Sequence, residues 1–200
     1  MQDLKRKNVL FKKLEVHLNS TKINNENIDA LLISLKIKKS DFYNLFPKKI
    51  NDICLYFFEN IYNISNKKVK KKVLLEKSIS KKTNLFLTEI IKNFDSKKKT
   101  SIFFLSYAIL NPLLLSKIIY KMSSNIWYDI GDQSTDFSYY TKRFILYNII
   151  RNSFFYWRKT LDQKKTINFS ERQIMFFGKI GKVKYSTKEF LAKKFKANLV

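Results

Sequence analysis

The residues best suited to chemistry lie together in one segment, WYDIGDQSTDFSYYTKR, which runs from Trp127 to Arg143. It contains three acidic residues, Asp129, Asp132 and Asp136, although the whole chain has a formal net charge of +24. Three carboxylates so close together could bind a metal ion, but acids in front of a helix more often cap it and offset its dipole. We therefore expect these acids to cap the next helix and to pair with Arg143 or with an arginine of a partner.

Arginine is the second unusual feature of this region. The chain has 40 lysines and arginines, of which only five are arginines, and four of the five are Arg143, Arg151, Arg158 and Arg172. A guanidinium group is planar and can meet a carboxylate with two parallel hydrogen bonds, which lysine cannot do. The first three of these arginines fall on one side of a straight helix. Their clustering indicates a place where the shape of arginine is needed as well as its charge.

No set of side chains resembles a catalytic site. His17 and Cys54 are the only histidine and the only cysteine, so an internal disulfide is excluded and these two residues alone cannot make a zinc site. We find no Ser-His-Asp set and no glycine-rich phosphate loop. We expect a non-enzymatic protein without a cofactor.

The elements that position these residues are predicted to be helices throughout. Only three glycines and two prolines interrupt long runs with helical periodicity, which indicates an all-α chain. Gly131 should end the helix that carries Trp127 in a left-handed conformation, and a long helix should follow over 134–158. Tyr139 and Tyr140 point about 100° apart on that helix, so both cannot be buried in one core.

The first sixty residues predict four helices. The first covers 3–18. A helix over 25–36, a tight turn and a helix over 40–46 have the spacing of a helix-turn-helix. Ser40 is suited to cap the second helix of this pair, and Pro47 is suited to begin the next helix.

This N-terminal pattern resembles TetR-type repressors, in which the helix at 40–46 would enter the DNA groove and neighbouring lysines would contact phosphates. The helix offers Asp41, Tyr43 and Asn44 for reading bases, but no arginine or glutamine. DNA binding and a purely structural role for this module are therefore both open.

The most apolar stretch, Ile102–Tyr120, is 19 residues long and could just span a bilayer. Asn111 and Pro112 lie at its centre, and Lys117 would cost about 2.5–3.5 kcal/mol if it faced lipid. We expect two short buried helices that meet at Pro112, with a membrane span as the alternative.

The positive charge has two explanations. Abundant Lys, Asn, Ile and Phe indicate an AT-rich genome, so part of the lysine content reflects mutational bias on solvated faces. The remainder favours an anionic partner, either nucleic acid or a membrane surface. The N-terminal helix is charged and amphipathic, so we predict no secretory signal peptide.

The segment from Trp127 to Arg143 resembles the Coq nine family of ubiquinone (coenzyme Q) biosynthesis accessory proteins. The family pattern runs approximately Trp-x-x-x-Gly-Asp-x-Ser-x-Asp-aromatic-x-x-Tyr-Thr-Lys/Arg-Arg. It falls here on Trp127, Gly131, Asp132, Ser134, Asp136, Phe137, Tyr140, Thr141, Lys142 and Arg143. The Tyr156-Trp157 pair and the element TINFSERQI, which contains Thr166, Phe169, Arg172 and Ile174, extend the resemblance, as does LFPKKINDICLYFF near the N-terminus.

The resemblance implies an all-α, TetR-like homodimer of about nine or ten helices, in which lipid binding has replaced DNA binding. Such a protein holds the isoprenoid tail of a quinone precursor and presents it to the di-iron demethoxyubiquinone hydroxylase. It attaches to an anionic membrane surface through a C-terminal amphipathic helix. We expect a cytoplasmic protein, peripheral on the inner membrane, or one on the matrix side of the mitochondrial inner membrane. The alternative function is a TetR-type transcriptional repressor.

The implied sites cover three surfaces. The family's partner-binding patch, carried over residue by residue, is Asp136, Tyr139, Tyr140 and Arg143. The lining of the lipid pocket, drawn from helices 102–120 and 137–155, is predicted to be Phe104, Tyr107, Leu114, Phe144 and Ile150. The membrane contact is predicted to be Phe190, Leu191 and Phe195. We expect the chain to consist of a helix-turn-helix-like module (1–64), a lipid-binding core (65–182) and a C-terminal amphipathic helix (183–200), all packed as one domain.

Overall fold

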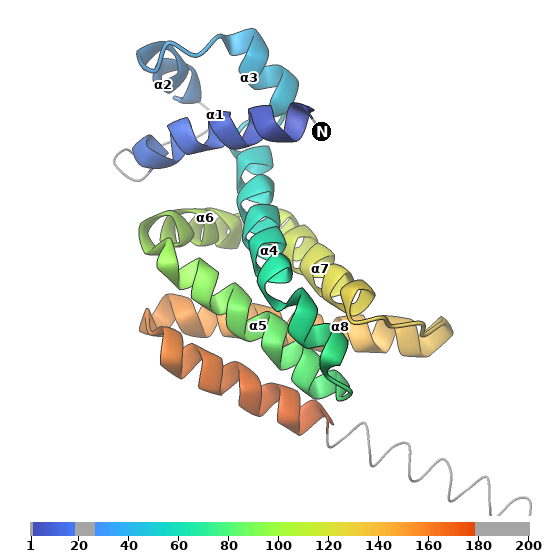
Figure 1. Ribbon diagram of the computed structural model, residues 1–200. Helices are drawn as coiled ribbons and strands as arrows, with labels where there is room; N and C mark the ends of the chain where they lie inside the picture. Colours follow the sequence, from blue (N-terminus) through green and yellow to red (C-terminus); the bar gives the residue numbers. More distant parts are fainter. Residues whose placement is uncertain (1, 19–26, 179–200) are drawn as a thin grey trace, which may run out of the picture.

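The computed structural model describes residues 2–18 and 27–178, and over these ranges every regular element is a helix, as predicted (Figure 1). The described helices are α1 (Gln2–Leu18), α2 (Ile28–Ser34), α3 (Lys39–Leu45), α4 (Ile50–Leu75), α5 (Ile79–Ser96), α6 (Lys98–Leu110), α7 (Pro112–Asp129), α8 (Asp136–Thr160) and a last helix over 163–178. The predicted all-α class, with nine or ten helices, is therefore confirmed for the described residues.

Helix α4 joins the two ends of the molecule. Figure 1 shows α1, α2 and α3 as a small group at one end, and α5 to α8 with the last helix as a larger bundle at the other. The 26 residues of α4 run from the small group into the bundle. The predicted boundary after residue 64 falls inside this helix, so the N-terminal module and the core share one continuous element.

Aromatic rings tie the N-terminal module to the bundle. The ring of Phe11 in α1 lies 6.3 Å from that of Phe57 in α4 and 6.2 Å from that of Phe104 in α6. The rings of Phe57 and Phe104 stack at 4.9 Å, and all three side chains are buried. Such ring pairs add about 0.5–1.5 kcal/mol beyond the burial of their area. The small group of helices is thus packed on the core.

The boundaries of α2, α3 and α4 differ from the sequence prediction. Helix α2 ends at Ser34 rather than at residue 36. Helix α3 begins at Lys39, with the extended Lys38 at its N-cap position, so the prediction that Ser40 caps this helix is wrong. Pro47 lies in a turn and α4 begins only at Ile50, so the prediction that Pro47 starts the helix is also wrong.

The reason for the late start of α4 is local backbone geometry. Lys49, at its N-cap position, has a positive φ of 52°, which breaks helical continuity with the turn before it. The carboxylate of Asp52 accepts a hydrogen bond from the backbone N–H of Lys48 at 2.7 Å. This bond stabilises the turn over residues 47–49, so these residues are not part of α4.

The apolar stretch 102–120 is divided between two helices, as predicted. Helix α6 ends at Leu110, and α7 begins with Pro112 as its first residue, where a missing N–H costs no hydrogen bond. The axes of α6 and α7 differ by 117°. Among the described helices none alone is long and apolar enough to cross a membrane, although this bent pair passes the same test by length and composition.

Candidate functional site

Gly131 shapes the corner between α7 and α8. Its φ of 81° is in the left-handed region. Its N–H donates to the carbonyl of Tyr128, and the N–H of Asp132 donates to the carbonyl of Trp127, both at 3.0 Å. This pair of bonds closes the end of α7 and turns the chain toward α8. The predicted left-handed helix end is confirmed, and α8 begins at Asp136, two residues later than predicted.

Asp132 is the electrostatic centre of this corner. Its side chain is only 4% exposed and accepts hydrogen bonds from the Ser134 hydroxyl at 2.6 Å, the Lys142 ammonium group at 2.7 Å and the Arg143 guanidinium group at 3.3 Å. Arg143 is itself buried and also donates to the carbonyl of Tyr139 at 3.2 Å. The predicted pairing of an acid with Arg143 is therefore confirmed, within the chain.

Two aromatic side chains complete the corner. The indole N–H of Trp127 donates to the backbone carbonyl of Lys142 at 3.1 Å, and the Lys142 ammonium group lies 5.4 Å from the centre of the Trp127 ring. The Cζ atom of Arg143 lies 3.3 Å from the centre of the Tyr139 ring. Cation–π contacts of this kind are favoured by arginine. The scarce tryptophan and arginine thus serve to fix α8 against α7.

Asp129, another acid of this corner, has partners on α4. Asp129, at the end of α7, accepts hydrogen bonds from the Tyr62 hydroxyl and, at 2.7 Å, from the Asn66 amide, both on α4. Among the described residues no group of three or more His, Cys, Asp or Glu side chains could hold a metal ion. Asp129 and Asp132 instead act as acceptors for groups of the protein itself.

The charge on Asp132 makes the stability of the protein sensitive to acid. Burial raises the pKa of Asp132, but hydrogen bonds from Lys142 and Ser134 and the charge of Lys142 outweigh it, so the pKa lies below its ordinary value of 3.8. A carboxyl whose pKa is lower in the folded state stabilises the fold above its unfolded pKa and loses this contribution as the pH falls through its folded pKa.

We expect the difference in thermal midpoint between the wild type and Asp132→Asn to be largest near neutral pH and to shrink as the pH falls below the ordinary value of 3.8. The amide cannot titrate, whereas the other carboxyls are common to both proteins and cancel in the difference. Thermal unfolding at a series of pH values measures it. A difference that does not change with pH would contradict the role assigned to this carboxylate.

An open groove lies between α7 and α8 beside the corner. Its volume is about 710 Å³, and its lining consists of Leu113, Ser116, Lys117, Tyr120, Tyr140, Arg143, Phe144 and Tyr147. Several of these side chains are unusually exposed for their type: Leu113 by 90%, and Tyr140 and Phe144 by 68% each. We call this surface the α7–α8 groove. Its walls are mostly apolar and aromatic, with Arg143 and Lys117 as cationic groups.

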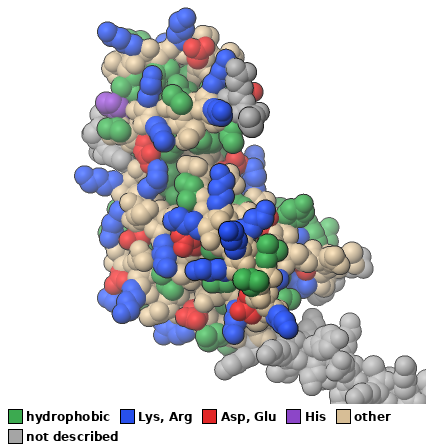
Figure 2. Space-filling view, viewed as in Figure 1, with side chains coloured by type: hydrophobic (Ala, Val, Ile, Leu, Met, Phe, Trp, Pro, Cys, Tyr) green, Lys and Arg blue, Asp and Glu red, His purple; other side chains and the backbone are tan. Residues whose placement is uncertain are grey.

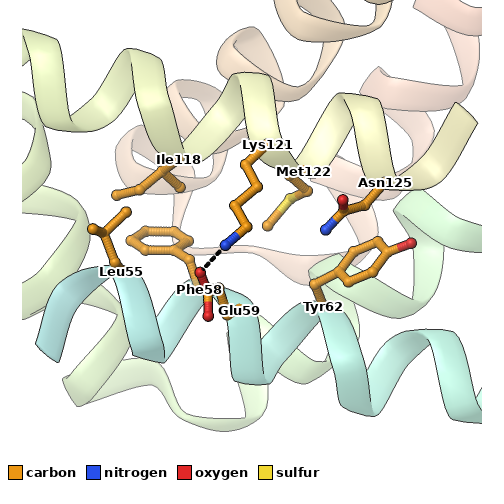
Figure 3. Close-up of a pocket in the computed structure, with 8 residues that line it drawn as sticks. All are labelled: Leu55, Phe58, Glu59, Tyr62, Ile118, Lys121, Met122 and Asn125. Carbon is orange, nitrogen blue, oxygen red and sulfur yellow. Dashed lines mark hydrogen bonds and ion pairs between the residues drawn. The ribbon is translucent and has the colours of Figure 1, made fainter. Parts of the chain in front are cut away.

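Two further hollows are smaller. A cavity of about 210 Å³ lies between α5, α7, α8 and the last helix, with Ile79, Trp127, Ile149 and Phe177 among its lining residues. The seam between α4 and α7, drawn in Figure 3, has a volume of only about 20 Å³. Lys121 and Glu59 form an ion pair across this seam, which leaves no room for an organic ligand.

The structure does not bring the five predicted lipid-lining residues together. Phe104 and Ile150 are buried in the packed core. Tyr107 is half-buried and donates to the Asn51 side chain at 2.7 Å, and Leu114 is half-buried. Only Phe144 lines the α7–α8 groove.

The groove residues that the sequence analysis missed carry a helical signal. Leu113, Ser116, Lys117 and Tyr120 are spaced by three and four along α7, and Tyr140, Phe144 and Tyr147 are spaced in the same way along α8. This periodicity marks residues that share a side of one helix. It does not state whether that side faces the core or solvent.

The predicted partner residues occupy different environments. Tyr140 is exposed and Tyr139 is half-buried, with their rings 5.2 Å apart, which agrees with the prediction that both cannot be buried in one core. Arg143 is buried against Asp132. The side chain of Asp136 lies outside the described residues, as do Phe190, Leu191 and Phe195 of the predicted membrane contact.

Comparison with known families tests the resemblance noted in the sequence. Residues 114–181 match the COQ9 family model. The COQ9 match covers about a third of the chain and includes most of α7, all of α8 and the last helix, and therefore the whole corner around Asp132. The resemblance to this family is confirmed over these residues. No curated protein and no solved structure gives a significant match to the chain.

Proposed function

We propose that this chain is a non-enzymatic lipid-binding accessory protein of ubiquinone biosynthesis. In this proposal it works as a homodimer at the inner membrane, holds an isoprenoid quinone precursor and presents it to the di-iron demethoxyubiquinone hydroxylase. The α7–α8 groove is the single observation that carries the proposal, because it lies within the helices that contribute most of the COQ9 match and exposes apolar side chains to a potential ligand.

The size and chemistry of the groove support the binding of an isoprenoid quinone precursor. Its volume of about 710 Å³ lies within the range of about 300–1,000 Å³ in which small-molecule sites occur. Phe144, Leu113 and Tyr120 offer apolar surface to a prenyl tail. Arg143 and Ser116 offer hydrogen-bond donors to a polar ring at the same site.

The helix-turn-helix-like module offers less support for the alternative, a DNA-binding repressor. The Tyr43 hydroxyl of α3 donates to Asp29 of α2, and Lys39 donates to the same carboxylate at 3.1 Å. Asp41 and Asn44, the other side chains of α3 suited to reading bases, line a groove that α3 shares with α1. The contacts of α3 therefore favour a structural role for this module.

Extraction of the purified protein followed by mass spectrometry tests the lipid site. We expect a prenylated quinone or another isoprenoid lipid in the wild-type extract. Phe144→Glu should lower its amount about tenfold or more, because a carboxylate would have to be desolvated against the tail. Phe155→Glu is the matched control, since Phe155 is a partly exposed phenylalanine on the same helix outside the groove. Repeated recovery of a folded, lipid-free wild type would overturn the lipid role.

A pull-down with the hydroxylase tests the partner surface. Tyr140→Ala should weaken the complex by about tenfold or more, as expected for an exposed aromatic anchor at an interface. Tyr128→Ala is the control, because Tyr128 is also exposed but lies on α7 outside the groove. Circular dichroism should show both variants fully helical. Equal binding by the wild type and Tyr140→Ala would remove Tyr140 from the partner surface.

A further inference from the structure

Exposed apolar side chains gather at the corner between α4 and α5. Leu74 and Leu75 end α4 and are 71% and 85% exposed, and Ile79, which begins α5, is 53% exposed. Single exposed leucines are ordinary on a soluble protein, but here three large aliphatic side chains are exposed within the same short turn between two helices. We call Leu74, Leu75 and Ile79 the α4–α5 tip.

Lysines are frequent on both sides of this tip in the sequence. Residues 67–82 contain eight lysines and a single acid. Lys68 pairs with Glu89 at 2.8 Å, and the Lys82 ammonium group donates to the carbonyl of Ile130 at 3.4 Å. The other six lysines are exposed: Lys67, Lys70, Lys71, Lys72, Lys77 and Lys81. Figure 2 shows lysines and arginines spread over this face of the molecule with hydrophobic side chains between them.

The fold holds the tip in a defined conformation. Val69 and Val73, on the inner side of the last turns of α4, are buried in the core. The carboxylate of Glu76, the one acid, accepts a hydrogen bond from the backbone N–H of Ser78 at 2.8 Å. The Ser78 hydroxyl in turn accepts from the N–H of Lys81 at 3.5 Å and caps α5. The corner therefore presents its leucines from an ordered backbone.

We propose that the α4–α5 tip is a membrane-docking surface for anionic phospholipids. Leu74, Leu75 and Ile79 enter the boundary between headgroups and acyl chains, while the surrounding lysines bind the negatively charged headgroups. The charge of the lysines identifies an anionic partner. The exposed leucines favour a bilayer over a nucleic acid, because a phosphate backbone offers them no apolar environment.

The position of the tip fits this role. Figure 1 places it at the end of the molecule opposite α2, next to the end of the last helix. Ile79 and Ser80 line the cavity of about 210 Å³ together with Phe177 and Gly178. The tip therefore adds a second membrane contact to the one proposed for 183–200. The residues of the tip lie outside the α7–α8 groove. The outcomes of the lipid extraction and of the hydroxylase pull-down are therefore independent of the outcome of a membrane-binding test of the tip.

Flotation of the full chain with vesicles tests the surface. We expect binding to vesicles of phosphatidylcholine mixed with phosphatidylglycerol and little binding to phosphatidylcholine alone. Leu75→Glu should lower the partition coefficient by about tenfold or more, since a leucine then no longer enters the apolar layer. Lys70→Glu should lower it by about fivefold or more. The matched controls are Ile33→Glu on α2 and Lys12→Glu on α1, which make the same changes at exposed positions at the other end of the molecule.

A fluorophore at the tip reports insertion directly. Cys54 is buried, so a cysteine introduced as Leu75→Cys can be labelled selectively with an environment-sensitive dye. The emission should shift to the blue when vesicles containing phosphatidylglycerol are added, and the same dye on Ile33→Cys should not respond.

Three outcomes would overturn the proposal. The first is equal loss of flotation in the tip variants and their controls, which would indicate attraction by net charge alone. The second is flotation without a shift of the dye at position 75, which would place the contact elsewhere. The third is absence of vesicle binding together with binding of a duplex oligonucleotide that Lys70→Glu abolishes, which would make the surface a nucleic-acid site.

Discussion

Asp132→Ala is expected to lower the free energy of unfolding by about 3–5 kcal/mol, because it leaves the buried guanidinium group of Arg143 without its counter-ion. The same change removes the acceptor for Lys142 and Ser134, so three side chains of the α7–α8 corner lose a partner. Arg143, Tyr140 and Phe144 line the groove on α8, and the loss should therefore also weaken binding of the lipid and of the hydroxylase. Chemical denaturation followed by circular dichroism measures the stability.

Two further variants test whether the loss of unfolding free energy comes from the unpaired charge of Arg143. Glu59→Gln breaks the ion pair with Lys121 in the seam between α4 and α7, where the two side chains are only half-buried, and should cost less than about 1 kcal/mol. Adding Arg143→Met to Asp132→Ala should restore much of the lost stability, because a buried ion pair can often be replaced by apolar side chains without penalty. If Asp132→Ala costs no more than Glu59→Gln, the corner does not depend on this carboxylate.

Trp157→Ala is expected to cost about 3–5 kcal/mol of unfolding free energy, as is usual when a large aromatic side chain is removed from a core. Trp157 lies in the last turns of α8 and is fully buried. Its ring meets that of Phe94 edge to face at 4.7 Å, and its indole N–H donates to the carboxylate of Asp95 at 2.7 Å. A loss of this size is a large share of the 5–15 kcal/mol that typically stabilises a domain.

The contributions of packing and hydrogen bonding can be measured separately. Trp157→Phe keeps most of the ring volume but removes the donor to Asp95, and should cost less than the alanine variant. Phe155→Ala, a partly exposed position on the same helix, should cost clearly less than either. Equal unfolding midpoints for Trp157→Ala and Phe155→Ala would show that α8 is not held to α5 by this tryptophan.

The helices and their interruptions could be predicted because the signals that set them act within a few residues. Apolar periodicity, with only three glycines and two prolines, indicated an all-α chain. Pro112 divided an apolar stretch into two helices, and Gly131 ended α7 in a left-handed conformation. The predictions that Ser40 caps α3 and that Pro47 starts α4 were wrong although both residue types are suited to these positions. The sequence does not indicate the positive φ of Lys49, which delays the start of α4.

The residues that form the α7–α8 corner could also be identified from the sequence. Tryptophan, arginine and aspartate stand out where lysine is otherwise the rule, and the structure joins Asp132 to Arg143 as predicted. The family resemblance rests on the same residues, and the match to residues 114–181 covers them.

Only the tertiary structure decided which side of each helix is available to a ligand. Phe104 and Ile150 have the apolar character expected of a lipid pocket, yet both are buried in the core, whereas the equally apolar Leu74, Leu75 and Leu113 are exposed. Spacing along a helix states which residues share a side, because it follows from the helical repeat. Which side faces solvent depends on where the neighbouring helices pack, and those neighbours come from distant parts of the chain.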